Sequence, residues 1–269
     1  TNKALTISAW CISEKKGGGV VMAHGGPLNG YALVIVKGLP TFMVRSEEKL
    51  ASVKGKRKIT NKWVHLAGVL TKDKKMRLYV DGALVGEAMA PGLVAKTPVQ
   101  GLQIGADALS SVGEYATPFA LKGVVDEVRV YHRALNELEM SKLADWGNEP
   151  KDKSLVLYSG FETGKAVDDS GNKHAGKMTS ANIVRAKTGK AVHFTGKSTP
   201  GGGGATVEHH WTQDIPVLVR AMAKAGDTLL LMGPPDLVDE EESFVRLTKG
   251  DKEIEKVLLE QEQALQGKQ

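Results

Sequence analysis

Apolar and polar residues alternate over short stretches in the first half of the chain. In LTISAWCI, the odd-numbered residues from Leu5 to Cys11 are apolar, whereas Thr6 and Ser8 are polar. Because successive side chains of a strand point to opposite faces, this pattern predicts a strand with one buried face. The stretches VVMAHGG, YALVIVKG, PTFMVR, KWVHLAGVL, GLQIGAD and GVVDEVRVY follow. Short strands spaced by about ten residues, without helical periodicity between them, predict a mainly β sandwich or jelly roll.

One turn between these strands has a specific signature. The stretch MRLYVDGALVGEA reads as two strands on either side of Asp81-Gly82. This dipeptide favours the positive backbone angles of a tight hairpin turn. We therefore expect a β-hairpin centred on these two residues.

The hydrophobic period changes after Tyr131. RALNELEMSKLADW has apolar residues at roughly helical spacing and predicts a short helix that closes the sandwich. Asn136 is the expected N-cap, with Glu139 three residues later as its capping-box partner. The expected apolar stripe of this helix consists of Leu135, Leu138, Leu143 and Trp146.

The remainder of the chain divides at a glycine run. KSLVLYSGFETG and KAVHFTG return to the strand pattern, and STPGGGGAT then predicts a flexible linker over residues 199–206. Beyond the linker, PVLVRAMAKAGDTLLLMGPPD predicts a hairpin, and DLVDEEESFVRL and DKEIEKVLLEQEQAL predict two helices. The second helix starts at Asp251, and its mainly apolar stripe is Ile254, Val257, Leu258, Gln261 and Leu265.

This C-terminal extension, residues 207–269, has too few apolar residues for a large core. Units of this size often need a partner for stability. We therefore expect it to be a partial second domain and the protein to be fused to further domains.

Composition narrows the function classes. The chain has 269 residues, is 41% hydrophobic and 25% charged, and has a net charge of +5. Its tightest basic run is KGKRK at residues 54–58, and only 5% of residues are aromatic. A nucleic-acid surface combines basic and exposed aromatic residues, so we interpret the run as a solvated loop.

Cysteine usage and hydropathy bear on the compartment. Cys11 is the only cysteine, which excludes an intrachain disulfide and a cysteine-based metal site. No apolar run approaches the roughly 18 residues that span a bilayer, and the N-terminus lacks a signal-peptide layout. The protein is either cytoplasmic, or its signal was removed or lies outside this sequence.

The stretches LTISAW, KWVHLAGVLTKDKKMRLYVDGALV, GLQIGAD and GVVDEVRVYHRALNELEM together resemble laminin-G-like, concanavalin A-type jelly rolls of bacterial extracellular proteins. The resemblance covers most of residues 1–147 and implies an extracellular or periplasmic setting. In that family the segment resembling residues 154–196 comes before the TISAW strand, whereas here it follows the helix. We expect a permuted domain over residues 1–198, although a second repeat beginning at this segment remains an alternative. WTQDIPVLVRAMAKAGDTLLLMGPPDLVDEEESF resembles the first part of a quinoprotein-type β-propeller.

The resemblance also implies a metal site in VDDSGNKHAGK. In similar jelly rolls such a loop shares a Ca²⁺ with the aspartate of the VDEVRVY strand. This loop is not an EF-hand, because a count from Asp168 puts glycine fourth and Thr179 twelfth. The alternative is an Asx-type turn whose side chains bond only to the backbone. The resemblance implies a structural calcium, with Asp126, Asp169 and Asn172 as ligands and Asp168 and the Gly171 carbonyl as further candidates.

A catalytic function is disfavoured. Glucanases that this scaffold resembles carry E-x-D-x-E or a close variant, which occurs nowhere in this chain. Asp126 and Glu127 are adjacent, so a regular strand would point them to opposite faces. We therefore expect a non-enzymatic module that recognises carbohydrate or another extracellular protein, without nucleic acid or a membrane span. The alternative is a structural accessory domain of an enzyme whose catalytic part lies elsewhere.

A sugar site would need exposed aromatic rings. The predicted loops offer Tyr31, in HGGPLNGY, and two rings in SSVGEYATPFA, Tyr115 and Phe119. These three residues are the candidate ligand contacts.

Overall fold

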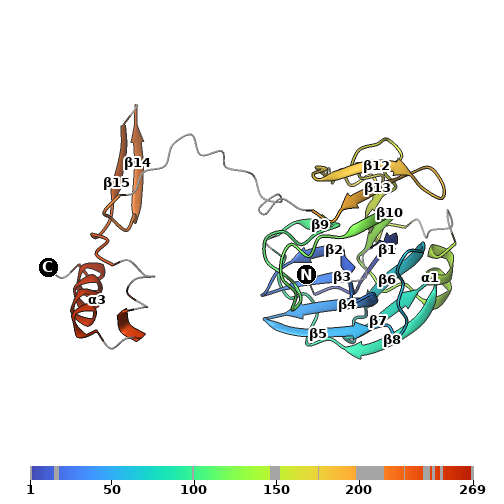
Figure 1. Cartoon of the computed structure of the whole chain (residues 1–269), viewed down its shortest axis with the longest axis horizontal. Helices are drawn as coiled ribbons and strands as arrows, with labels where there is room; N and C mark the ends of the chain where they lie inside the picture. Colours follow the sequence, from blue (N-terminus) through green and yellow to red (C-terminus); the bar gives the residue numbers. More distant parts are fainter. Residues whose placement is uncertain are drawn as a thin grey trace. The chain divides into compact units, whose positions relative to one another are not determined.

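The computed structural model divides the chain into unit 1, Thr1–Thr206, and unit 2, Val207–Gln269. Figure 1 shows the elements of both units. The structure describes residues 2–14, 18–98, 100–145, 152–174, 176–197, 215–226, 228–238, 243, 246–248 and 251–267.

Two antiparallel sheets form unit 1 (Figure 1). The larger has eight strands in the order β12-β13-β10-β1-β6-β7-β8, with β11 beside β10, and the smaller has the order β5-β4-β3-β2-β9. The bounds in the larger sheet are β1 Leu5–Ser13, β6 Val64–Leu70, β7 Lys75–Val80, β8 Ala83–Met89, β10 Lys122–Tyr131, β11 Leu155–Ser159, β12 Ala181–Arg185 and β13 Lys190–Thr195. Those in the smaller sheet are β2 Gly18–Gly25, β3 Gly30–Val36, β4 Leu39–Ser46, β5 Lys49–Lys54 and β9 Leu102–Ile104. The expected mainly β, concanavalin A-like sandwich is confirmed.

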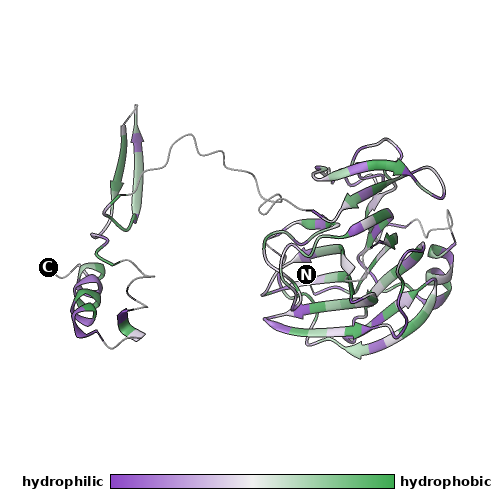
Figure 2. Ribbon diagram, viewed as in Figure 1, coloured by the Kyte–Doolittle hydropathy of each residue, from purple (hydrophilic) through white to green (hydrophobic). Residues whose placement is uncertain are grey.

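The main core lies between the two sheets. The odd-numbered residues of β1 from Leu5 to Cys11 belong to it, as the alternation predicted. Phe42 of β4 packs over Gly68 of β6, where a Cβ would lie only 2.4 Å from the Phe42 ring. Hydrophobic and hydrophilic residues share the strands of both sheets in Figure 2, because each sheet has one face on this core.

The Asp81-Gly82 hairpin joins β7 to β8 as predicted. Both residues have positive φ, 49° and 79°. Two further strands, β5 and β12, were not predicted. Their sequences, KLASVK and ANIVR, alternate weakly, and no residue of β12 is fully buried.

Helix α1 (Glu137–Leu143) covers part of the outer face of the larger sheet. Its capping box between Asn136 and Glu139 is confirmed. Met140 and Leu143 pack with sheet residues in a second apolar cluster. Leu138, expected in the stripe, is 67% exposed, so that part of the prediction is wrong. Trp146 lies outside the described residues.

Strand β10 contains a bulge that determines the geometry of the candidate metal site. Ser8 of β1 pairs with Arg129, whereas Trp10 pairs with Asp126, so β10 has one residue more than β1 between these pairs. Glu127 is in this interval and has a φ of 54°. An inserted residue interrupts the alternation of faces. The opposite orientation expected for Asp126 and Glu127 therefore does not hold at this bulge.

The second edge of β10 is divided between two strands. β13 pairs with residues Lys122–Val125, and β11 pairs with residues Val128–Tyr131. Asp126 and Glu127 lie between these two ladders, where neither strand pairs with them. Segments from residues 154–196 thus join the sheet that contains β1, and leave a gap at the bulge.

Unit 2 contains the predicted hairpin, β14 (Ala221–Ala225) with β15 (Thr228–Met232), and the helix α3 (Lys252–Leu265). Asp251 is the N-cap of α3, as expected. The buried Gln261 side chain accepts a hydrogen bond from Leu237 N and donates one to Pro235 O. In the helix predicted over 236–247, residues 236–238 are not helical, residues 243, 246 and 247 are, and the others lie outside the described residues.

Candidate functional site

Asp126 carries a buried carboxylate at the bulge. Its side chain is 1% exposed, and its Oδ1 accepts a 2.8 Å hydrogen bond from Glu127 N. Its Oδ2 is also buried and accepts no hydrogen bond from the residues that the structure describes. Burial raises the pKa of Asp126 to about 7, and the charges of Glu127 and Glu162 add to the effect. This oxygen is a place for a proton or a cation.

Glu127 is already engaged by neighbouring side chains. Its Oε2 accepts a hydrogen bond from the guanidinium of Arg129, and its Oε1 accepts one of 2.9 Å from the Tyr158 hydroxyl. The Arg129 guanidinium also lies 4.4 Å from the centroid of the Tyr158 ring. These contacts join β10 to β11. Both oxygens of Glu127 therefore accept hydrogen bonds from its neighbours.

Asp168 organises the loop after β11. Its Oδ1 accepts hydrogen bonds from Ser170 N and Tyr158 N at 2.9 and 3.2 Å, and its Oδ2 accepts one from His174 N at 3.0 Å. Burial favours the neutral carboxyl, but hydrogen bonds from Ser170 and from main-chain N–H groups outweigh it and lower the pKa of Asp168. The Asp168 carboxylate is thus occupied by the turn.

Asn172 also holds the loop in place through hydrogen bonds. Its Nδ2 donates to Leu155 O and to Val156 O, both at 3.0 Å, and so ties the loop to β11. Gly171 has a φ of 89°, which places it in the left-handed region that glycine adopts without strain. Asp168 thus makes the Asx-type contacts of this loop, while Asn172 Nδ2 also donates to the Ser170 side chain at 3.0 Å.

Asp169 is the loop residue that remains available. Its side chain is exposed, and its Oδ2 is 3.4 Å from Gly160 N, a weak contact. Gly160 follows Ser159, which pairs with Val128, so Asp169 is held beside the gap at the bulge.

The fit of a calcium ion to the predicted ligands is partial. Asp126 and Asp169 offer oxygens, and Asn172 uses only its Nδ2 in the bonds of the turn, whereas both oxygens of Asp168 accept hydrogen bonds there. No three His, Cys, Asp or Glu side chains converge to hold a metal within the described ranges. Calcium also accepts carbonyl and water ligands, so two carboxylates can suffice.

A second candidate site lies on the outer face of the smaller sheet. Val112 is buried there against apolar residues of β2, β3 and β4. Tyr115 and Phe119, here called the aromatic pair, pack against the same cluster with their ring centroids 5.2 Å apart and their planes at 31°. Both rings are half-buried, so each is partly open to solvent.

Asp107 holds the aromatic pair in place, a contact that sequence reasoning missed. Its carboxylate is fully buried, and its Oδ2 accepts hydrogen bonds from the Tyr115 hydroxyl at 2.7 Å and from Val112 N at 3.1 Å. Its main-chain N donates to Pro118 O at 2.9 Å. Burial raises the pKa of Asp107 despite these bonds. The loop is therefore a fixed support for the rings.

Tyr31 does not join the aromatic pair. It lies in β3, is 8% exposed and belongs to the core between the sheets. Its hydroxyl is 3.0 Å from His24 Nδ1. The expectation that Tyr31 presents its ring from an exposed loop is wrong, because the β3 alternation turns it inward.

The family model described as "Concanavalin A-like lectin/glucanases superfamily" matches residues 1–141, more than half of the chain. The chain belongs to this superfamily. No curated protein sequence matches it. The concanavalin A-like unit thus has the fold that its strand pattern and residue motifs predicted.

Several solved structures are similar to this chain. A native heptameric SAP-like pentraxin from Limulus polyphemus shares 16% identity, with 72% of this chain and 83% of that chain covered and a TM-score of 0.49. A putative carbohydrate binding protein from Bacteroides ovatus ATCC 8483 shares 18%, with 71% and 51% covered and a TM-score of 0.47. The CBM40 of a Ruminococcus gnavus IT-sialidase, bound to α2,3-sialyllactose, shares 15%, with 53% and 83% covered and a TM-score of 0.42.

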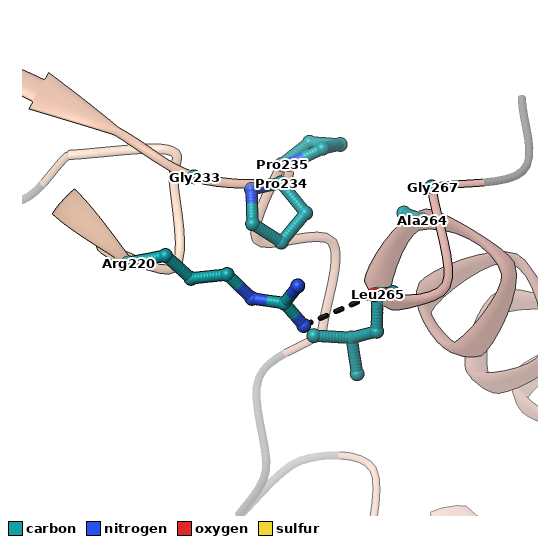
Figure 3. A pocket seen from close by; sticks show the side chains of 7 residues that line it. All are labelled: Arg220, Gly233, Pro234, Pro235, Ala264, Leu265 and Gly267. Atoms are coloured by element: carbon teal, nitrogen blue, oxygen red, sulfur yellow. Dashed lines mark hydrogen bonds between the residues drawn. The ribbon is translucent and has the colours of Figure 1, made fainter.

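Unit 2 contains a hollow of about 380 Å³ between the end of α3 and the segment after β15 (Figure 3). Arg220 points into it and donates a 3.0 Å hydrogen bond to Leu265 O. This cation therefore caps the negative end of the helix. The other lining residues are Gly233, Pro234, Pro235, Ala264 and Gly267, which bring no reactive group.

Within the described residues, no helix has both the length and the apolar character that a bilayer crossing requires.

Proposed function

We propose that unit 1 is a non-catalytic carbohydrate-recognition module whose ligand contacts the aromatic pair. The observation that carries this proposal is the pair of half-buried rings on a concanavalin A-like scaffold: Tyr115, held by the buried Asp107 carboxylate, and Phe119, which packs against it. Rings that are fixed before binding lose little conformational entropy when a ligand stacks on them. A preformed aromatic surface therefore favours ligand binding.

The chemistry of the surface suits a saccharide. Sugar rings present C–H groups that pack on aromatic faces, together with hydroxyls that need hydrogen-bond partners. The Tyr115 hydroxyl is held by Asp107, so this residue offers its ring alone. Glu114 and Thr117 are exposed beside it and supply polar groups for hydroxyls. This combination supports stacking at the centre of the site with polar contacts at its rim.

The carboxylates at the bulge support a non-catalytic function. Hydrolysis of a glycosidic bond requires two carboxyls flanking the bond, one as acid and one as base or nucleophile. Asp126 is buried, and both oxygens of Glu127 accept hydrogen bonds within the protein. The motif E-x-D-x-E is missing from the sequence.

The test is binding of the purified whole chain to a glycan array, followed by titration calorimetry with each hit. Tyr115→Ala and Phe119→Ala should each weaken binding by about tenfold, the effect of removing a stacked ring. Tyr31→Phe is the control and should bind normally, since its ring is in the core. Binding that survives both alanine variants would refute the aromatic-pair site. A wild-type chain that binds no glycan would favour the accessory-domain alternative.

We also propose a structural calcium at the gap beside the bulge, held by Asp126 and Asp169 with main-chain oxygens. The buried, unpartnered Asp126 Oδ2 supports this assignment, because a cation there would offset the cost of a buried charge. The extracellular or periplasmic setting and the propeller-like continuation of unit 2 stay predictions from resemblance.

A further inference from the structure

The loop after β5, residues 55–62, is bound firmly to the rest of unit 1. Ile59 is 2% exposed and belongs to the main core. Its N donates to Gly38 O at 3.0 Å, while Gly55 N donates to Pro40 O and Asn61 N donates to Ser13 O, both at 2.8 Å. The KGKRK run is thus a solvated loop, as expected, and its backbone is fixed by these contacts.

The charged residues of this loop are all basic. No acidic residue occurs between Lys49 and Lys72. The Lys58 side chain lies beside the β3–β4 turn, where its Cγ is 3.4 Å from the position that a Cβ at Gly38 would occupy. This brings it next to the lysine that precedes this glycine. The exposed side chains at this place, here called the basic end, are Lys37, Lys54, Lys56, Arg57, Lys58 and Lys62.

The charges of the basic end have no ion-pair partner among the residues that the structure describes. None of its six side chains forms an ion pair with a described residue. Some cations elsewhere in unit 1 do have partners, such as Lys75 with Asp73 and Lys122 with Glu14, each at 3.8 Å. Like charges gathered without partners repel one another and attract an anionic ligand. The fixed backbone keeps them together.

We propose that the basic end binds an acidic polysaccharide, a chain carrying repeated carboxylate or sulfate groups. This inference rests on the proposed carbohydrate recognition and names the chemical class of one ligand. Six exposed cations on an open surface match a polymer with several anionic groups better than one small anion. From Lys37 to Lys62 the only aromatic residue is Phe42, which is buried, and Trp63, next to Lys62, is half-buried, so the basic end offers few rings for nucleic-acid bases.

The experiment measures binding of the whole chain to labelled dextran sulfate and polygalacturonate, with neutral dextran alongside, at several salt concentrations. The basic-end variant combines Lys56→Gln, Arg57→Gln and Lys58→Gln. The control combines Lys72→Gln, Lys74→Gln and Lys75→Gln, which removes the same charge from the first residue of β7 and the turn before it. Thermal midpoints establish that both variants are folded.

We expect the wild-type chain to bind at least one acidic polymer, with affinity that falls as salt rises. The basic-end variant should bind about tenfold or more weakly at low salt, and its affinity should depend less on salt. The control should stay within about twofold of the wild type, because its lysines lie beside an acid.

Three results would overturn the inference: no binding of either acidic polymer, equal losses in both variants, or equally tight binding of duplex DNA. The last would indicate a general polyanion surface. Failure of this inference can be distinguished from failure of the aromatic-pair proposal. A chain that binds acidic polymers through the basic end but binds no neutral glycan retains this site and loses the other.

Discussion

Replacement of Asp126 by asparagine should stabilise the calcium-free protein at alkaline pH. Burial, together with Glu127 and Glu162, raises the pKa of Asp126 to about 7 from an ordinary value of 3.8. The folded state then holds this proton more tightly than the unfolded state does. Stability from this group is therefore fully present below pH 3.8 and is lost as the pH rises through about 7.

The size of the effect follows from the same values. A difference of about three pKa units corresponds to about 4 kcal/mol, which is an upper limit for the cost of the buried charge at pH 8. Asparagine is nearly the same size and can still accept the hydrogen bond from Glu127 N, and it carries no charge. We expect Asp126→Asn to raise the free energy of unfolding by about 2 kcal/mol at pH 8 in EGTA, and to change it very little at pH 4.

Urea unfolding at both pH values, followed by far-ultraviolet circular dichroism, measures this difference. Calcium should then stabilise the wild type and leave the variant unchanged, because the ion loses a carboxylate ligand. Asp169→Asn is the matched control: its exposed side chain should matter little in EGTA, but the calcium effect should disappear. An Asp126→Asn variant that is less stable than the wild type at pH 8 in EGTA would refute the inference that the buried Asp126 charge destabilises the calcium-free protein.

Three further substitutions test other parts of unit 1. Asp168→Ala should lower the free energy of unfolding by about 3 kcal/mol in a thermal melt, because main-chain N–H groups lose their acceptor. Any stabilisation by calcium should remain, because no metal ligand is removed. Loss of the calcium effect would contradict the assignment of Asp168 to the turn. Glu127→Gln should lower the free energy of unfolding in urea by about 3 kcal/mol, since the buried Arg129 guanidinium loses the charge of Glu127. An unchanged urea midpoint would contradict this expectation. Gly68→Ala should cost about 1–3 kcal/mol by displacing Phe42, whereas Gly101→Ala, which meets open space, should be neutral in the same assay.

Strands with a strong alternation could be predicted from the sequence, because burial of one face depends on local spacing. The inward residues of β1 are an example, and so are the Asp81-Gly82 turn and the Asn136 cap, whose geometry involves neighbours within a few residues. Strands β5 and β12 escaped prediction. They lie at sheet edges, where fewer side chains are buried, so their apolar alternation is weak. Backbone pairing with the neighbouring strand stabilises them instead.

The candidate sites depended on contacts that local patterns do not encode. Tyr115 and Phe119 were found as aromatic residues in a small-residue loop, but the buried Asp107 that fixes them has no sequence signature. Asp168 is a residue type that binds calcium, and only the N–H groups that donate to its carboxylate show that it belongs to the turn.

The sequence by itself determined the class of fold, the main strands and the residues from which sites could be built. The tertiary structure alone decided that Glu127 forms a bulge, that Asp126 lies in the gap between β11 and β13, and that the KGKRK run is anchored by Ile59. The physical reason is that alternation and turn propensity act over a few residues. The burial of a charge and the neutralisation of a cation depend on which distant strands become neighbours.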